Sequence, residues 1–200
     1  MSRSHRAAIL AALLLLPAAA IAQAKQKPKH DPANPGHPPQ GRAVVRTKEM
    51  IIRSALSAAP AHLRADARVL NPGLDGKMVE LRAGSNGWTC LADAPDSPGP
   101  DPMCVDEEGM KWAEAWMSHA EKPANTSPGI AYMLAGGSDI SATDPWATKT
   151  TKYVASPPHW MLLWPVDAKA SGLPVKPKKT GTWIMWAGTP YAHLMINHVP

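Results

Sequence analysis

The sequence predicts an α+β fold: a single domain with a mainly antiparallel sheet, packed by two helices and closed by one disulfide. Helical patterns lie early in the chain, whereas short apolar runs between turn residues fill its second half. Neither an internal repeat nor an alternation of strands and helices is present, which argues against a parallel sheet. Two hundred residues, 44% of them hydrophobic, suffice for one domain with a core.

The first 24 residues have the pattern of a secretory signal peptide. Arg3 and Arg6 precede an apolar run over 7–21, and a small-x-small cleavage site ends at Ala24. We expect cleavage after Ala24 and a periplasmic or secreted location. The apolar run is shorter than the roughly 20 residues of a membrane span, and no later stretch approaches that length, so no transmembrane anchor is predicted.

Residues 25–45 are predicted to form a disordered, proline-rich linker, and residues 46–200 the folded domain. Loss of the two arginines with the signal peptide lowers the formal net charge from +5 to about +3, and much of that charge lies in the linker. No basic patch interleaved with aromatic residues follows. Nucleic acid is therefore not expected as a partner.

The first helix is predicted after Thr47, a good N-cap, and before Pro60. Apolar residues at helical spacing support it: Ile51, Ile52, Ala55, Leu56 and Ala59. A further helical turn is expected within 61–67. Segments 67–70 and 77–82 then resemble two strands of a hairpin, because a turn-forming sequence separates them.

The only two cysteines, Cys90 and Cys104, are predicted to form a disulfide, because an oxidising compartment preserves such bonds and no metal-type spacing is present. Closing a loop of this length stabilises a fold by about 3 kcal/mol in the chain-entropy model. Trp88 and Cys90 share one side of a short strand.

A second helix is expected from Asp106, an N-cap followed by two glutamates. Its apolar stripe is Met110, Ala113, Met117 and Ala120, widened by Trp112 and Trp116. The remaining strands are predicted at 130–135, 159–164, 182–187 and 191–196. The last two form an antiparallel hairpin, because only residues 188–190 connect them.

Four motifs resemble a family of exported bacterial proteins of unknown function. They are RAGSNGWTC at 82–90, DPMC at 101–104, AYMLAGGSDISATDP at 131–145 and GTPYAHLM at 188–195. The resemblance covers about residues 50–197. It implies export of a single domain and implies no activity, cofactor or catalytic residue.

Candidate sites come from three patterns. His159, His193 and Asp139 are candidate acid–base groups or metal ligands if their strands are neighbours. Asp139 and Asp144 follow a buried strand and offer oxygens to a hard cation such as calcium, although turn residues that satisfy their own backbone are the favoured interpretation.

Tryptophan is the third pattern, because indoles can line a groove for a sugar or a cationic ligand. The candidate ligand-binding residues are Trp160, Trp164, Tyr191, Ser138 and Asp139. The ten methionines suggest thioether ligands for copper, but they are scattered singly, so we interpret them as core residues. No cofactor is predicted.

The leading hypothesis is an exported, non-enzymatic domain that binds a small molecule or a protein partner. Motifs for a nucleophile elbow, a phosphate loop, a zinc protease or a dinucleotide site are absent from the sequence. A metal-assisted or acid–base hydrolase that uses His159, His193 and Asp139 is the first alternative. A structural protein of the cell envelope is the second.

Overall fold

The computed structural model describes residues 46–73, 77–94, 97 and 99–197. The predicted signal peptide and the predicted linker over 25–45 lie outside these residues. None of the helices in the described part of the chain combines the length and the apolar composition that a membrane span requires.

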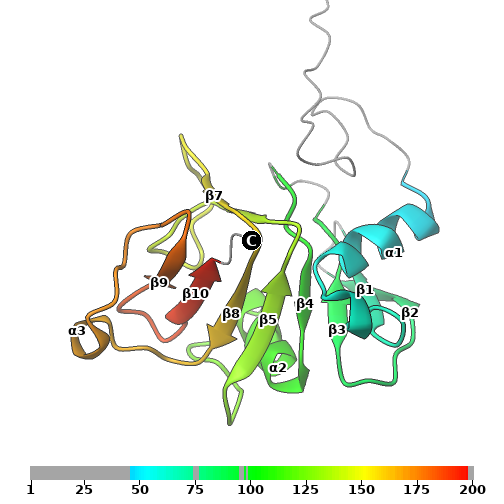
Figure 1. Ribbon diagram of the computed structural model, residues 1–200, viewed down its shortest axis with the longest axis horizontal. Coiled ribbons are helices and arrows are strands. Elements are labelled where there is room, and N and C mark those ends of the chain that lie inside the picture. The colour runs from blue at the N-terminus through cyan, green and yellow to red at the C-terminus, as the bar shows by residue number, and fades with distance from the viewer. Residues whose placement is uncertain (1–45, 74–76, 95–96, 98, 198–200) are drawn as a thin grey trace, which may run out of the picture.

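One eight-stranded sheet organises the domain, with the strand order β2-β1-β3-β4-β5-β8-β10-β9 (Figure 1). Its strands are β1 (Arg68–Pro72), β2 (Met78–Arg82), β3 (Thr89–Leu91), β4 (Met103–Val105), β5 (Gly129–Met133), β8 (His159–Leu163), β9 (Gly181–Met185) and β10 (His193–Asn197). Six of the seven pairings are antiparallel, and β1 and β3 pair in parallel. The α+β fold with a mainly antiparallel sheet is therefore confirmed.

Helix α1 (Lys48–Ser57) packs on one face of the sheet at its β1–β4 end (Figure 1). Thr47 caps it as expected, because its side chain accepts a hydrogen bond from the Met50 N–H at 3.3 Å. The buried Ala55 contributes to a core cluster that also contains Val69 and both cysteines. A 3₁₀ turn, η1 (Ala61–Leu63), follows Pro60.

Helix α2 (Glu107–Met117) packs on the opposite face, against β4 and β5. We call this the α2 face. The Asp106 carboxylate accepts the Gly109 N–H at 2.7 Å and the Ile130 N–H at 3.0 Å, so one side chain joins the helix start to β5. A Cβ on Gly129 would lie 2.4 Å from the Gly109 nitrogen. Only glycine lets the helix approach the strand this closely.

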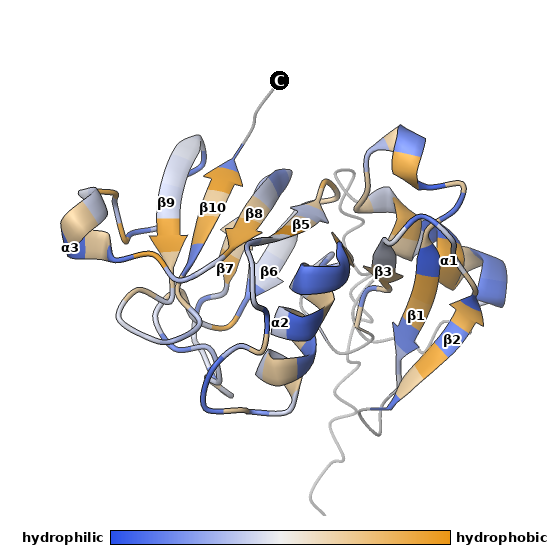
Figure 2. Cartoon of the chain, turned by 90° about the horizontal axis from the view of Figure 1, so that it is seen from below, coloured by the Kyte–Doolittle hydropathy of each residue, from blue (hydrophilic) through white to orange (hydrophobic). Residues whose placement is uncertain are grey.

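Alternation along each strand assigns the side chains to the two faces. Val105, Ala131, Met161 and Met195 occupy adjacent register positions and belong to the core cluster beneath α2. Figure 2 shows hydrophobic residues along β8 and β10, with α2 on one side of the sheet.

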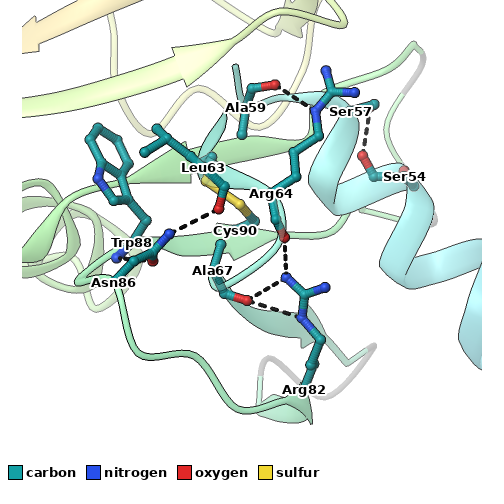
Figure 3. Close-up of a disulfide and its surroundings, with 11 residues drawn as sticks. Ser54, Ser57, Ala59, Leu63, Arg64, Ala67, Arg82, Asn86, Trp88 and Cys90 are labelled. Carbon is teal, nitrogen blue, oxygen red and sulfur yellow. Dashed lines mark hydrogen bonds between the residues drawn. A yellow bond between two sulfur atoms is a disulfide. The ribbon is translucent and has the colours of Figure 1, made fainter. Parts of the chain in front are cut away.

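The disulfide is present as predicted, between Cys90 on β3 and its register partner Cys104 on β4 (Figure 3). Both cysteines are fully buried. Nearby, the Arg82 guanidinium donates to the carbonyl oxygens of Ala67 and Arg64, and the Asn86 amide donates to that of Leu63 at 2.9 Å. The polar residues of the RAGSNGWTC motif thus fasten the turn before β3 to η1.

Some elements differ from those expected. Residues 137–139, interpreted as a turn, form strand β6 (Gly137–Asp139), which pairs with β7 (Val154–Ser156) in a separate ribbon. Three-residue strands leave no periodicity to detect. A short third helix, α3 (Ala168–Ser171), is also present. The predicted strand 182–187 ends at Met185, because Trp186 adopts a positive φ of 53° and begins a turn.

Candidate ligand-binding cavity

A cavity of about 450 Å³ lies on the α2 face. Its walls come from α2, from the sheet, from the loop that closes the disulfide, and from the segment 138–153 that contains β6 and the approach to β7. The floor is the row of strands β4, β5, β8, β10 and β9. Elements from both halves of the chain therefore build one site.

Seven of the ten methionines line this cavity: Met78, Met103, Met117, Met133, Met161, Met185 and Met195. Five of them come from five different strands, one each from β4, β5, β8, β9 and β10, always at positions that face α2. Met161, Met185 and Met195 are buried, as the core interpretation requires, while Met103 and Met133 are partly exposed. Residues scattered in the sequence thus form one thioether-rich surface.

Three indoles form another wall. Trp112 and Trp116 come from α2 and Trp186 from the turn after β9, with ring centroids 5.6–6.3 Å apart. The Trp116 Nε1–H donates to the Pro145 carbonyl at 2.9 Å, and the Trp186 Nε1–H donates to the Ser141 carbonyl at 2.9 Å. These two bonds fix the segment 138–153 over the cavity.

The charged groups of the lining are acidic. Asp101, Asp139 and Asp144 line the cavity, and no lysine or arginine of the described ranges does. Burial raises the pKa of Asp139 to about 7. Burial, together with a hydrogen bond to Asp93, also raises the pKa of Asp101 well above its ordinary value, so this carboxyl retains its proton at neutral pH.

His193 is buried at the cavity wall, with Nδ1 2.9 Å from the Tyr191 carbonyl oxygen. Burial lowers the pKa of His193 to about 4, so the ring is neutral. Because a carbonyl can only accept, Nδ1 carries the proton and Nε2 is left as an acceptor. The ring meets Trp112 and Trp186 edge-on, at 5.2 and 5.1 Å between centroids.

The three candidate acid–base residues are only partly brought together. Asp139 and His193 line the same cavity, whereas His159 does not line it. His159 is buried on β8, with Nδ1 2.7 Å from the Pro157 carbonyl oxygen and no partner for Nε2 among the described residues. Burial lowers its pKa as well. No hydrogen bond within the described part of the chain connects two of the three side chains.

The predicted hard-cation site lies at the cavity edge. Asp139 and Asp144 both line the cavity, but in the described ranges no three His, Cys, Asp or Glu residues gather around one point. Ser141 Oγ accepts the N–H groups of Thr143 and Asp144, at 3.1 and 3.0 Å. These polar residues therefore satisfy the local backbone.

The predicted ligand-binding residues divide between the cavity and other places. Ser138 and Asp139 line the cavity, and Ser138 Oγ is buried without a partner among the described residues. Trp160 pairs with Tyr132 on the face opposite α2, and Trp164 is 37% exposed beyond the end of β8. Tyr191 is fully buried, and its hydroxyl donates to the Ala120 carbonyl at 2.9 Å.

Sequence reasoning missed most of the lining residues. Trp112 and Trp116 were visible as an i, i+4 pair, although they were assigned only to helix packing. The group of methionines becomes visible when the positions of each strand that face α2 are compared, but this comparison requires the strand order. No family model, curated protein or solved structure matches the chain, and the resemblance to an exported bacterial family stays a prediction.

Proposed function

We propose that this protein is an exported binding protein that takes a small, largely apolar molecule into the cavity on the α2 face and does not transform it. The observation that supports this proposal is the lining itself: seven methionines and three tryptophans around about 450 Å³. Ligand sites typically have about 300–1,000 Å³ and an apolar lining with a few polar groups. Ser138, Asp139 and His193 are such groups.

The methionines also indicate how selective the site is. Their unbranched, polarisable side chains adapt to ligands of different outline, and surfaces rich in methionine are common where one protein binds several partners. The indoles of Trp116 and Trp186 are more rigid, because their N–H groups donate hydrogen bonds to backbone carbonyls. We therefore infer a cavity with a rigid aromatic wall and a deformable thioether floor.

The test uses an uncharged apolar probe, N-phenyl-1-naphthylamine, whose fluorescence rises in apolar surroundings. Ala147 lines the cavity, so Ala147→Trp fills part of it, while Ala170→Trp places the same indole on the exposed side of α3. We expect saturable binding to the native protein and to Ala170→Trp, and an affinity at least about tenfold lower for Ala147→Trp. Absence of saturable binding to the folded native protein would refute the proposal and favour the structural alternative.

Acid–base catalysis is a second candidate, favoured by the presence of Asp139 and His193 in one cavity. A carboxyl whose pKa is about 7 suits a general acid or base at neutral pH. The neutral His193 would serve as an acceptor only. Turnover of p-nitrophenyl acetate that is abolished in Asp139→Asn and kept in Asp66→Asn would support this candidate over simple binding.

Export is part of the proposal. It is supported by the signal-peptide pattern and by a buried disulfide, which persists in oxidising compartments. Mass spectrometry of the protein recovered from the periplasm and from the medium tests it. The expected mature chain begins at Lys25, and a full-length chain found only in the cytoplasm would refute export.

A further inference from the structure

We propose that the ligand of the cavity is an organic cation, an aromatic or alkyl ammonium compound whose charged group lies beside Asp139 and the indole wall. This inference rests on the proposed binding function and specifies its ligand class. It depends on three features of the cavity: the sign of its charges, the unpaired state of one carboxylate, and the aromatic lining.

The sign of the charges is uniform. The whole chain has a formal charge of +5, with 21 lysines and arginines, yet no basic residue of the described ranges lines the cavity. Three carboxyl groups do. An anionic ligand would find no positive partner among these residues and would meet the ionised carboxylates in a poorly solvated space, where repulsion is costly.

The Asp139 side chain has no partner in the part of the chain that the structure describes. No hydrogen bond or ion pair to its carboxylate is formed by the described residues, and burial alone accounts for the raised pKa. Asp139 is partly exposed in the cavity, but a carboxylate that is this poorly hydrated is normally paired, because an isolated one loses hydration without compensation. The next residue back, Ser138, also has a buried hydroxyl without a partner. An ammonium group would satisfy the Asp139 carboxylate, since it offers a positive charge and N–H donors.

The other titratable groups around Asp139 do not supply a positive charge. His193 on β10 and His159 on β8 are neutral, because burial lowers the pKa of both. Across the cavity, Asp101 is protonated at neutral pH, while Asp144 and Tyr153 stand at the exposed edge. From α2 the lining consists of Trp112, Trp116 and Met117. The cation must therefore come with the ligand.

The lining favours an organic cation over a metal ion. Hard divalent ions require several oxygen ligands, and the described residues gather no such group. Indoles attract organic ammonium groups through their negative faces. Trp112, Trp116 and Trp186 line the same cavity as Asp139, and the methionine floor accommodates the apolar part of the ligand.

The test compares three probes that share one ring system: 1-naphthylmethylamine, 1-naphthylmethanol and 1-naphthoate. Calorimetry near pH 8 should give the tightest binding for the amine, about tenfold weaker binding for the alcohol, and the weakest for the carboxylate. The affinity for the amine should fall as the pH is lowered to about 5.5, since Asp139 then gains its proton. The affinity for the alcohol should stay constant.

Asp139→Asn should remove the preference for the amine while preserving binding of the alcohol. Asp66→Asn, at an exposed site outside the cavity, makes the same change in net charge and should behave as the native protein. Equal binding of amine and alcohol by the native protein would overturn the cation inference and leave the binding function standing. Failure of all three probes would overturn both. If Asp139→Asn does not fold, the pH profile of the native protein still decides the question.

Discussion

Met161 and Met195 are direct register partners on the neighbouring strands β8 and β10, and both side chains are buried on the α2 face beneath the cavity. The two residues are far apart in the sequence. The same methionines thus form the floor of the cavity and part of the hydrophobic core. A substitution at either position should therefore affect both ligand binding and the stability of the fold.

Truncating a methionine side chain in this layer should therefore destabilise the fold. For Met195→Ala we expect a loss of about 2–5 kcal/mol in the free energy of unfolding, because the substitution leaves a cavity in a packed core. Met195→Leu, which nearly keeps the volume, should cost less than about 1.5 kcal/mol. Urea denaturation measures both. Met50→Ala, at a residue that is 42% exposed, is the control, and equal effects at positions 50 and 195 would contradict the burial of Met195.

Removal of the disulfide should lower thermal stability while keeping ligand binding in the folded fraction. For Cys90→Ser/Cys104→Ser we expect a loss of about 3 kcal/mol from the larger entropy of the open chain, with an added cost for two buried hydroxyls. Melting followed by circular dichroism provides the measurement. A reducing agent should lower the melting temperature of the native protein and leave that of the variant unchanged. Identical melting of both proteins under oxidising conditions would defeat this prediction.

Neutralising Asp139 should change how stability depends on pH. Its folded-state pKa of about 7 is above the ordinary 3.8, so ionisation penalises the folded state as the pH rises through this window. Compared with the native protein, Asp139→Asn should gain stability between about pH 4 and 7 and show a constant difference above. His193 has the opposite effect in both proteins, because its folded-state pKa is lowered. Subtracting one denaturation series from the other cancels it, and a flat difference would contradict the raised pKa.

The contact of α2 with β5 should tolerate no side chain at position 129. In Gly129→Ala the new Cβ would lie 2.4 Å from the Gly109 nitrogen, and this clash forces the helix and the strand apart. We expect a loss of several kcal/mol, comparable to severe overpacking. Gly99→Ala, whose Cβ would meet only the Ser138 side chain at 3.3 Å or more, should be much milder. Chemical denaturation distinguishes the two, and equal stability would argue against the close packing.

Much of the fold was accessible from the sequence, because its signals are local. Thr47 and Asp106 start the two longer helices as N-caps, and Pro60 follows the end of the first. The β9–β10 hairpin followed from its short connection, and the disulfide from the cysteine count. Each of these features depends on a few neighbouring residues, or on a chemical rule that needs no coordinates.

The cavity was less accessible, because it depends on which strands are neighbours. Trp186 lines the site only because the chain turns with a positive φ at this residue. Trp160 is an equally plausible ligand-binding residue by sequence alone, yet strand alternation places it on the face opposite the cavity. Likewise, the parallel pairing of β1 with β3 joins segments without a local signal. Composition indicated tryptophan and methionine as important residue types but not which of them share a space.

The seam between β4 and β5 has a mechanical consequence. Only two register pairs join these strands, Cys104 with Tyr132 and Val105 with Ala131, so the sheet consists of an early half and a late half that meet along a short border. Both halves contribute walls to the cavity. A bound ligand would therefore contact both halves and hold them together across that border. Occupancy should thus make the two halves melt as one unit and shield the border from proteases.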